Sequence, residues 1–233
     1  MSDLERLPAG EEKVALVRSM FDSIAPRYDL LNRVMTMRMD VGWRRRAVAA
    51  LDLPASSLVL DVACGTGDLC RDLEAVGHRA VGIDFSAGML AVARVSSPLV
   101  QADALALPVA DRMVDGITCG FALRNVASLP GLFAEFARVL RVNGRVSLLE
   151  VAHPESSLLR AGHHLYFHRV VPLIGGLLSD RQAYRYLPRS AAYLPERIEL
   201  MHLLSSAGFA DVRVMPLALG SAQLITATRE GDS

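Results

Sequence analysis

Residues 58–70 read LVLDVACGTGDLC, and this run constrains the fold more than any other part of the chain. An apolar strand ends in Asp61, and the glycine loop at 63–67 then opens a helix. Such a loop offers backbone N–H groups and a nearby carboxylate to a small polar cofactor. It lacks the third glycine of a dinucleotide fingerprint and the Lys-Ser/Thr pair of a phosphate loop. The loop therefore suits a nucleoside that carries an amino acid better than a nucleoside that carries a pyrophosphate. A plain tight turn remains the alternative.

Two further carboxylates close apolar runs along the chain. The run at 80–83 ends in Asp84, and Asp103 follows a third short strand. An acid at the tip of the second strand can accept hydrogen bonds from both ribose hydroxyls, and Asp103 can accept one from an adenine amine. The alternative for Asp84 is a helix cap, a role that Ser86 could equally serve. Three acids at regular spacing beside a glycine loop favour the cofactor site over isolated turns.

Strands and helices alternate through the middle of the chain. Strands are predicted at 58–63, 80–85, 97–103, 114–122 and 145–152, with helices that include 86–94 and 131–140 and a turn at 142–144. This alternation predicts right-handed crossovers and a parallel sheet with its ligand at the carboxyl ends of the strands.

The flanking segments complete a single α/β domain over residues 1–233. Helices are predicted at 14–28 and 38–51, a helical insert at 156–176, a polar stretch at 179–190, a helix at 195–207 that ends at Gly208, and closing strands at 209–215 and 222–228. We divide the domain into a helical cap (1–52), a cofactor-binding core (53–153), a helical substrate-side insert (154–194) and a C-terminal helix with closing strands (195–233).

Composition excludes several classes of partner. The 25 basic and 25 acidic side chains balance, so nothing indicates nucleic acid. No uncharged stretch reaches the ~18–20 apolar residues of a spanning helix. The polar N-terminus is unlike a signal peptide, and the three cysteines (Cys64, Cys70 and Cys119) indicate reduced thiols, so we expect a cytoplasmic protein. His164 and His168 share a helical face, but no catalytic zinc pattern accompanies them, and we predict no metal site.

The runs LDVACGTGDL, VGIDFS and QADALALP resemble the class I S-adenosylmethionine-dependent methyltransferases. This resemblance implies a Rossmann-like sheet of seven mostly parallel strands, and S-adenosylmethionine as the cofactor. In that family the glycine loop faces the methionine part, the second-strand acid holds the ribose and the third acid meets the adenine. The implied cofactor contacts are Asp61, Gly65, Thr66, Gly67, Asp84, Phe85, Asp103 and Ala104.

Longer runs resemble the ubiquinone/menaquinone C-methyltransferase family of the UbiE/MenG type. They are MFDSIAPRYDLLNRVMTMRMDVGWRRR at 20–46, TCGFALRNV at 118–126 and RQAYRYLPRS at 181–190, within a likeness that extends from about Val17 to Val214. The chain departs from the family pattern at Arg38 (usually glycine), Asp40 (usually histidine), Ala122 (usually glycine) and Gly120 (usually a serine that touches the cofactor). Residues 217–221 also replace the usual run LTGGI. Because some departures fall near the expected substrate pocket, the methyl acceptor stays open.

This second resemblance implies methylation of a ring carbon of a prenylated quinol, most simply demethylmenaquinol to menaquinol. Such a carbon is a poor nucleophile unless the neighbouring hydroxyl is deprotonated, which requires a base or a cation. We interpret Arg124 as stabilising the phenolate, Asn125 as orienting the ring hydroxyl, and Tyr28 as closing the pocket or relaying a proton. The alternatives are a surface ion pair for Arg124 and a helix cap for Asn125.

Three further questions stay open at this stage. The apolar segment at 165–178 is either a core-packed lid or a wall for a polyprenyl chain that rests on the membrane, which would make the protein peripheral at the inner face. The arginines at 44–46 form a solvated helix face or meet anionic headgroups, and Glu150 is structural or lines the pocket. A homodimer is an expectation that no motif requires.

The other functions to test are a paralogous C- or O-methyltransferase of an aromatic or isoprenoid metabolite, and a non-catalytic cofactor-binding partner in a quinone-synthesis complex.

Overall fold

The computed structural model describes residues 10–152 and 190–231. The predicted insert at 156–176, nearly all of the polar stretch at 179–190 and the apolar segment at 165–178 lie outside this part of the chain. Within it, no helix is long and apolar enough to cross a membrane.

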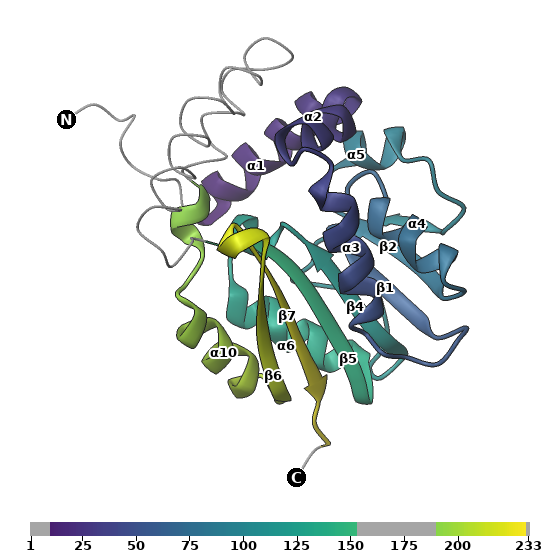
Figure 1. Ribbon diagram of the computed structural model, residues 1–233, viewed down its shortest axis with the longest axis vertical. Coiled ribbons are helices and arrows are strands. Elements are labelled where there is room, and N and C mark those ends of the chain that lie inside the picture. The colour runs from purple at the N-terminus through teal and green to yellow at the C-terminus, as the bar shows by residue number, and fades with distance from the viewer. Residues whose placement is uncertain (1–9, 153–189, 232–233) are drawn as a thin grey trace, which may run out of the picture.

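A seven-stranded sheet forms the centre of the fold, in the order β3-β2-β1-β4-β5-β7-β6 (Figure 1). The strands are β1 (Leu58–Val62), β2 (Arg79–Asp84), β3 (Leu99–Gln101), β4 (Val114–Gly120), β5 (Leu140–Val151), β6 (Phe209–Leu217) and β7 (Ala222–Arg229). The first five strands pair in parallel, and β7 pairs antiparallel with both β5 and β6. The predicted fold class, a Rossmann-like and mostly parallel sheet, is confirmed.

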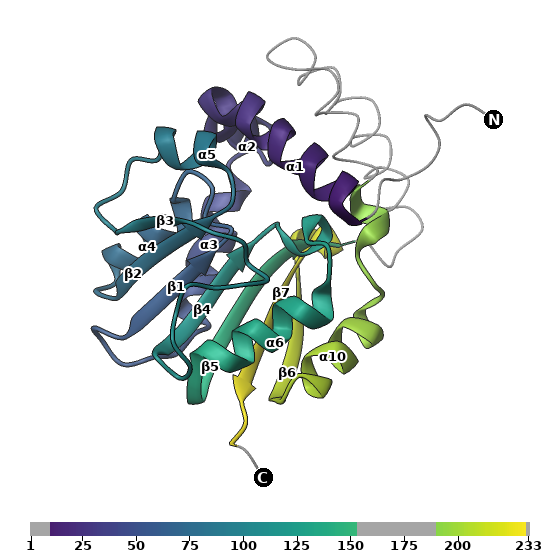
Figure 2. The same cartoon turned by 180° about the vertical axis from the view of Figure 1, so that it is seen from behind.

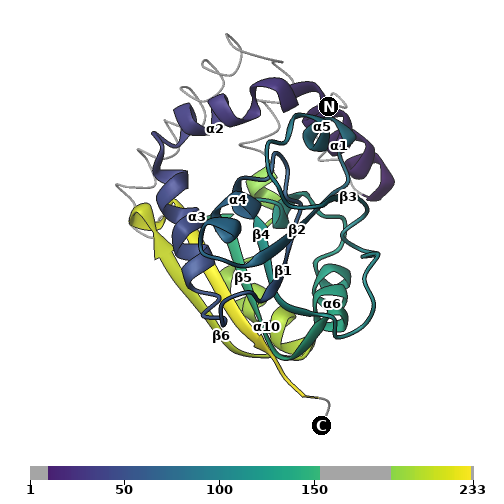
Figure 3. The same cartoon turned by 90° about the vertical axis from the view of Figure 1, so that its right-hand side faces the viewer.

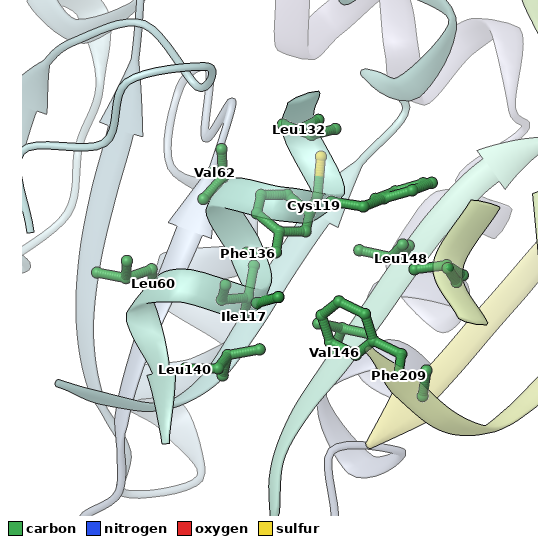
Figure 4. Packing of buried hydrophobic residues seen from close by; sticks show 14 of the residues in the cluster. Leu60, Val62, Ile117, Cys119, Leu132, Phe136, Leu140, Val146, Leu148 and Phe209 are labelled. Atoms are coloured by element: carbon green, nitrogen blue, oxygen red, sulfur yellow. The ribbon is translucent and has the colours of Figure 1, made fainter. Parts of the chain in front are cut away.

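Helices cover both faces of the sheet because successive strand residues point to opposite sides. On one face, α3 (Met39–Ala49) and α4 (Asp68–Ala75) pack against strand residues such as Val59 and Leu149. On the other face, α6 (Leu129–Val139) and α10 (Arg197–Ser206) pack against Leu60 and Leu148. Figure 4 shows the buried residues on the face that α6 and α10 cover, from close by. Figure 3 shows α3 and α6 on opposite sides of the strands.

The N-terminal helices form a third layer over the carboxyl ends of the strands (Figures 1 and 2). A single helix was predicted at 14–28, but α1 (Gly10–Ile24) ends earlier and is followed by a short 3-10 turn, η2 (Ala25–Arg27), and by α2 (Tyr28–Met35). Pro26 explains the break, since it has no N–H to donate and disfavours helical geometry at the residue before it. These helices bury Val17, Met20, Ile24 and Leu31 against Met89 of α5 (Ala87–Val92).

One predicted turn is a strand irregularity instead. The turn at 142–144 lies inside β5, whose pairing with β4 shifts between Val114 and Gly116. Asn143 has a φ of 65°, and five steps along β5 (140 to 145) match two along β4 (114 to 116), so β5 takes up three extra residues as an enlarged bulge without ending the strand. The remaining strand and helix predictions in the described part agree with the structure to within a few residues at each end.

The close approach of α1 to α5 makes Gly88 a testable point of the fold. A Cβ at Gly88 would lie 2.9 Å from Oδ1 and 3.0 Å from Cα of Asp22. We therefore expect Gly88→Ala to lower the free energy of unfolding by about 1–3 kcal/mol, measured by urea unfolding. The matched control is Gly42→Ala in α3, where an added Cβ meets nothing within 4 Å, and it should raise stability by about 0.5–1 kcal/mol. A stabilising Gly88→Ala would contradict the close packing of these helices.

Candidate active site

A cavity opens at the carboxyl ends of β1 to β4 and encloses about 830 Å³ of empty space, including its mouth. Its walls come from the loops that follow these four strands and from α1 and α2. The lining includes Val14, Val17, Phe21, Tyr28, Ala63, Gly65, Asp84, Phe85, Met89, Asp103, Ala104, Leu105, Gly120, Phe121 and Asn125. The site residues predicted from loops far apart in sequence therefore converge on one space.

Asp84 connects the glycine loop to the end of β2. Its Oδ2 accepts the N–H of Gly65 at 2.8 Å, and its Oδ1 accepts the N–H of Ser86 at 2.8 Å. The helix cap of α5 is Ser86, whose Oγ accepts the N–H of Met89 at 3.1 Å. Burial raises the pKa of Asp84. Each carboxylate oxygen has a second lone pair, so Asp84 can hold the loop and still accept hydrogen bonds from a ligand in the cavity.

The glycine loop presents only part of itself to the cavity. Ala63 and Gly65 line it, whereas Thr66 and Gly67 do not. Gly67 has a φ of 82°, and a Cβ there would lie 2.6 Å from Cγ1 of Val95, so this position requires glycine. The hydroxyl of Thr66 donates to Oδ1 of Asp29 at 2.5 Å. Two of the predicted contacts therefore shape the loop and lie outside the cavity wall.

Asp61 also lies behind the cavity wall. It is 1% exposed, and it accepts hydrogen bonds from the hydroxyl of Thr118 at 2.9 Å and from the thiol of Cys70 at 3.5 Å. Burial raises the pKa of Asp61 to about 7 and outweighs the two hydrogen bonds, which act in the opposite direction. Asp61 thus joins β1, β4 and α4 directly beneath the loop.

Three further residues for which the resemblance implies cofactor contact also line the cavity. Phe85, Asp103 and Ala104 all contribute to its wall, and Oδ1 of Asp103 accepts the N–H of Leu105 at 2.9 Å. This bond holds the loop after β3 in a turn of the kind that aspartate side chains form with their own backbone.

Gly120 lines the cavity at the end of β4, where the resemblance expected serine. A Cβ at this position would lie 3.0 Å from Cδ1 of Leu69, so even a small side chain would crowd the first turn of α4. Glycine therefore matches the local packing of this chain.

Arg124 lies in η3 (Leu123–Asn125), directly after β4, but it does not line the cavity. The guanidinium of Arg124 pairs with the fully buried Glu150, and its Nε donates to Oγ of Ser190 at 3.1 Å. The backbone N–H of Arg124 donates to Oε2 of Glu150 at 3.3 Å. Arg124 is 7% exposed. The alternative of an ion pair is therefore confirmed, but the expectation that this pair lies at the surface is wrong, because the pair is buried. Glu150 likewise does not line the cavity and holds Arg124 from β5.

Asn125 and Tyr28 both face the cavity. The amide of Asn125 donates to the carbonyl of Phe121 at 3.4 Å. Burial raises the pKa of Tyr28, although its hydrogen bond with Asn32 and the charge of Arg124 oppose the change. The Tyr28 phenol is therefore protonated at neutral pH and can donate a hydrogen bond into the cavity.

Sequence reasoning missed the contribution of α1 to the site. Val14, Val17 and Phe21 form an apolar wall of the cavity, and only their helical spacing is visible in the sequence. Polar contacts fix this helix over the loops. Asp22 accepts hydrogen bonds from Oγ of Ser86 at 2.5 Å and from the N–H of Gly88 at 3.0 Å, and Lys13 donates to the carbonyl of Val126 at 2.8 Å.

The arginines at 44–46 separate into two environments. Arg44 is an ion-pair hub between α3 and α4, with carboxylates of Asp40, Asp68 and Asp72 around it. Arg45 and Arg46 are exposed. The prediction of a solvated face is therefore wrong for Arg44, because its side chain is only 12% exposed and is surrounded by acids.

The charge of the cavity lining is compatible with S-adenosylmethionine. The charged side chains that line it are Asp84 and Asp103, and no lysine or arginine of the described residues does so. This arrangement suits a cationic sulfonium nucleoside and disfavours a phosphate-bearing one, which would require cations or a phosphate loop. Among the described residues, no group of three metal-binding side chains is present.

Known methyltransferases are similar to this chain over nearly its whole length. A model of the ubiE/COQ5 methyltransferase family matches residues 8–229. The demethylmenaquinone methyltransferase of Roseiflexus castenholzii is 42% identical, over 97% of this chain and 98% of its own. The corresponding enzyme of Deinococcus radiodurans is 42% identical (90% and 92%), and the ubiquinone/menaquinone biosynthesis C-methyltransferase UbiE of Geobacter sulfurreducens is 38% identical (92% and 89%).

Solved structures share the fold at low sequence identity. A SAM-dependent methyltransferase of Thermotoga maritima, described as a possible histamine N-methyltransferase, gives a TM-score of 0.65 at 18% identity, over 91% of this chain and 99% of its own. A phosphoethanolamine N-methyltransferase of Haemonchus contortus, solved with S-adenosyl-L-methionine, gives 0.57 at 14% identity, over 79% and 52%. These likenesses show the class I methyltransferase fold.

The buried carboxyl of Asp61 predicts a pH-dependent stability. Its pKa is raised to about 7, so between the ordinary aspartate pKa of about 4 and pH 7 the folded protein holds a proton that the unfolded chain releases. Wild type should therefore lose stability relative to Asp61→Asn as the pH rises from about 5 to about 7, by at most about 1.4 kcal/mol per pH unit.

Urea unfolding at pH values across this window measures the difference. Asp211→Asn, which changes an exposed carboxylate on β6, is the matched control and should follow wild type. Parallel profiles for wild type and Asp61→Asn would contradict the assignment.

Proposed function

The chain belongs to the ubiE/COQ5 methyltransferase family and is an S-adenosylmethionine-dependent methyltransferase, and from this premise we propose that it methylates a ring carbon of a prenylated quinol. The simplest reaction is demethylmenaquinol to menaquinol, in menaquinone biosynthesis. The observation that carries this proposal is one cavity that is lined both by Asp84 and Asp103 and by the apolar wall of α1. Such a cavity can accept a cationic donor on one side and an aromatic acceptor on the other.

The proposed donor contacts divide into direct and supporting residues. When bound, S-adenosylmethionine supplies an electrophilic methyl group on a sulfonium. Asp84 would accept from the ribose hydroxyls and Asp103 from the adenine amine, with Gly65, Phe85, Ala104 and Gly120 forming the surface beneath. Asp61, Thr66 and Gly67 would act indirectly, since they fix the loop from behind.

The acceptor requires a hydroxyl that loses its proton beside the reacting carbon. Asn125 would orient this hydroxyl, and the protonated Tyr28 would donate to the developing phenolate. Arg124 would act through its charge, because Glu150 and Ser190 already hold its guanidinium. The effect of Arg124 on the pKa of Tyr28 supports this role, since the same field favours a nearby phenolate.

Gly120 and Ala122 are departures from the family pattern that line the cavity, whereas the other departures lie away from it and support retained quinol chemistry more than a paralogous substrate. In the described part of the chain, Arg38, Asp40 and residues 217–221 do not line the cavity. Arg38 has a φ of 64°, a conformation that suits the usual glycine, and Asp40 is held by Thr36 and Arg44. These changes are therefore accommodated locally.

The substrate also determines the proposed setting of the enzyme. A polyprenyl chain partitions into the bilayer, so we expect peripheral contact with the inner face of the membrane and no nucleic-acid partner. A homodimer stays a prediction that the oligomeric state in solution would test.

Donor binding tests the role of Asp84. We expect Asp84→Ala to weaken S-adenosylmethionine binding by about ten- to a hundredfold in calorimetry, because charged hydrogen bonds of about 1.5–3 kcal/mol are lost. Asp211→Asn is the control for a general loss of negative charge and should bind as wild type does. An unchanged Kd for folded Asp84→Ala would remove this residue from the site.

Methyl transfer tests the reaction. We expect purified protein with methyl-labelled S-adenosylmethionine to convert demethylmenaquinol, reduced in a lipid extract, into a product heavier by one methyl group in mass spectrometry. The double variant Arg124→Gln/Glu150→Gln removes both charges while keeping hydrogen-bonding groups, and should bind the donor with greatly reduced turnover. Donor binding without quinol methylation would favour the paralogue, and absence of donor binding would favour the non-catalytic partner.

A further inference from the structure

The outward face of α2 is apolar and basic, and this combination is uncommon on a free protein surface. The helix has two distinct faces, since Tyr28, Leu31 and Met35 pack inward with the buried residues of α1 and with Met89 of α5. We define the α2 face as the outward residues of α2 and the turn that follows it: Leu30, Arg33, Val34, Met37, Arg38 and Met39.

Exposure on this face is large for apolar side chains. Leu30 is 54% exposed, Met37 is 68% exposed, and Val34 and Met39 are each about two-fifths exposed. Leu30 and Val34 are four residues apart, so they lie on one side of the helix, and Met37 lies in the turn that follows α2. Figures 1 and 3 show α2 at the end of the molecule formed by the N-terminal helices, away from the closing strands.

The charge on this face is of one sign. Between residues 27 and 39 the acidic residue is Asp29, and its carboxylate is engaged by Thr66 on the inner side. Arg38 is exposed and makes no ion pair with the described residues, and Arg33 is half-exposed beside it. From Gly10 to Ala49 the chain has eight basic and five acidic side chains, although its net charge is zero. This stretch therefore has a net charge of +3 (eight basic minus five acidic side chains).

We propose that the α2 face docks on an anionic lipid bilayer, with Leu30, Val34, Met37 and Met39 inserted among the headgroups and Arg33 and Arg38 paired with lipid phosphates. Apolar insertion combined with basic side chains is the physical signature of interfacial helices. Docking here would bring the cavity to the membrane, because Tyr28 on the inner side of the same helix lines the cavity and a helix is about 10 Å across. The inference rests on the proposed function for its substrate and stands on separate observations for its surface.

Vesicle flotation tests the docking surface directly and requires no activity. We expect the full chain to float with vesicles of phosphatidylcholine and phosphatidylglycerol and to bind pure phosphatidylcholine vesicles more weakly, with binding reduced by salt. Arg33→Gln/Arg38→Gln should weaken binding about fivefold for each arginine, and Leu30→Ser/Met37→Ser about tenfold in total. The control is Ile198→Ser on α10, which removes an equally exposed apolar side chain (69%) far from α2 and should bind as wild type does.

Three results would overturn the proposal. They are absence of flotation by wild type, equal flotation by Leu30→Ser/Met37→Ser, and a wild-type dimer that this variant converts to a monomer in analytical ultracentrifugation. Methyl transfer to a short-chain quinol in solution distinguishes this failure from failure of the proposed function. If the protein methylates the quinol but does not float, only the proposed docking surface is overturned. If it floats but does not methylate the quinol, only the proposed substrate is overturned.

Discussion

The carboxylate of Asp84 is the interaction on which the site depends most. It is 6% exposed at the end of β2, and it accepts two backbone N–H groups, from Gly65 and from Ser86. The first bond fixes the loop after β1, and the second fixes the start of α5. A buried carboxylate is costly unless its oxygens are satisfied, so the protein can keep Asp84 in the wall only with both partners in place. The same geometry leaves lone pairs on the cavity side, and support of the fold and contact with a ligand therefore coincide in one residue.

The N-terminal helices extend this organisation across the cavity. Asp29 engages Thr66 of the first loop, Asp22 engages Ser86 of the second, and Lys13 engages Val126 after β4. Each contact joins a helix side chain to a loop that lines or supports the cavity. Because apolar residues of α1 provide the facing wall, the cap both closes the space and orients it. A sheet without this cap would present the same loops to open solvent.

The sequence predicted the architecture well because glycine loops, strand-closing acids and alternating elements are local signals. The convergence of Gly65, Asp84, Asp103 and Asn125 at one edge of the sheet followed from parallel topology, whereas the order of the strands was not predicted. The position of the Arg124 side chain could not be predicted, since its partner Glu150 lies on another strand and an arginine has many rotamers. The short helix α2 was missed because the apolar periodicity of α1 continues across Pro26. In both cases tertiary contacts decide a conformation that local propensity leaves open.

The distribution of charge connects the fold to the proposed chemistry. The cavity wall contains carboxylates, and Arg124 is held outside the wall by a fully buried glutamate. A cationic donor in this cavity meets no lysine or arginine side chain of the described residues in the wall, and the charge of Arg124 partly offsets the burial that raises the pKa of the Tyr28 phenol. An exposed guanidinium in the wall would compete with the sulfonium for the same carboxylates. Placing the cation one layer back, with its countercharge fixed on β5, allows one small cavity to accept a positive donor and still stabilise a negative acceptor.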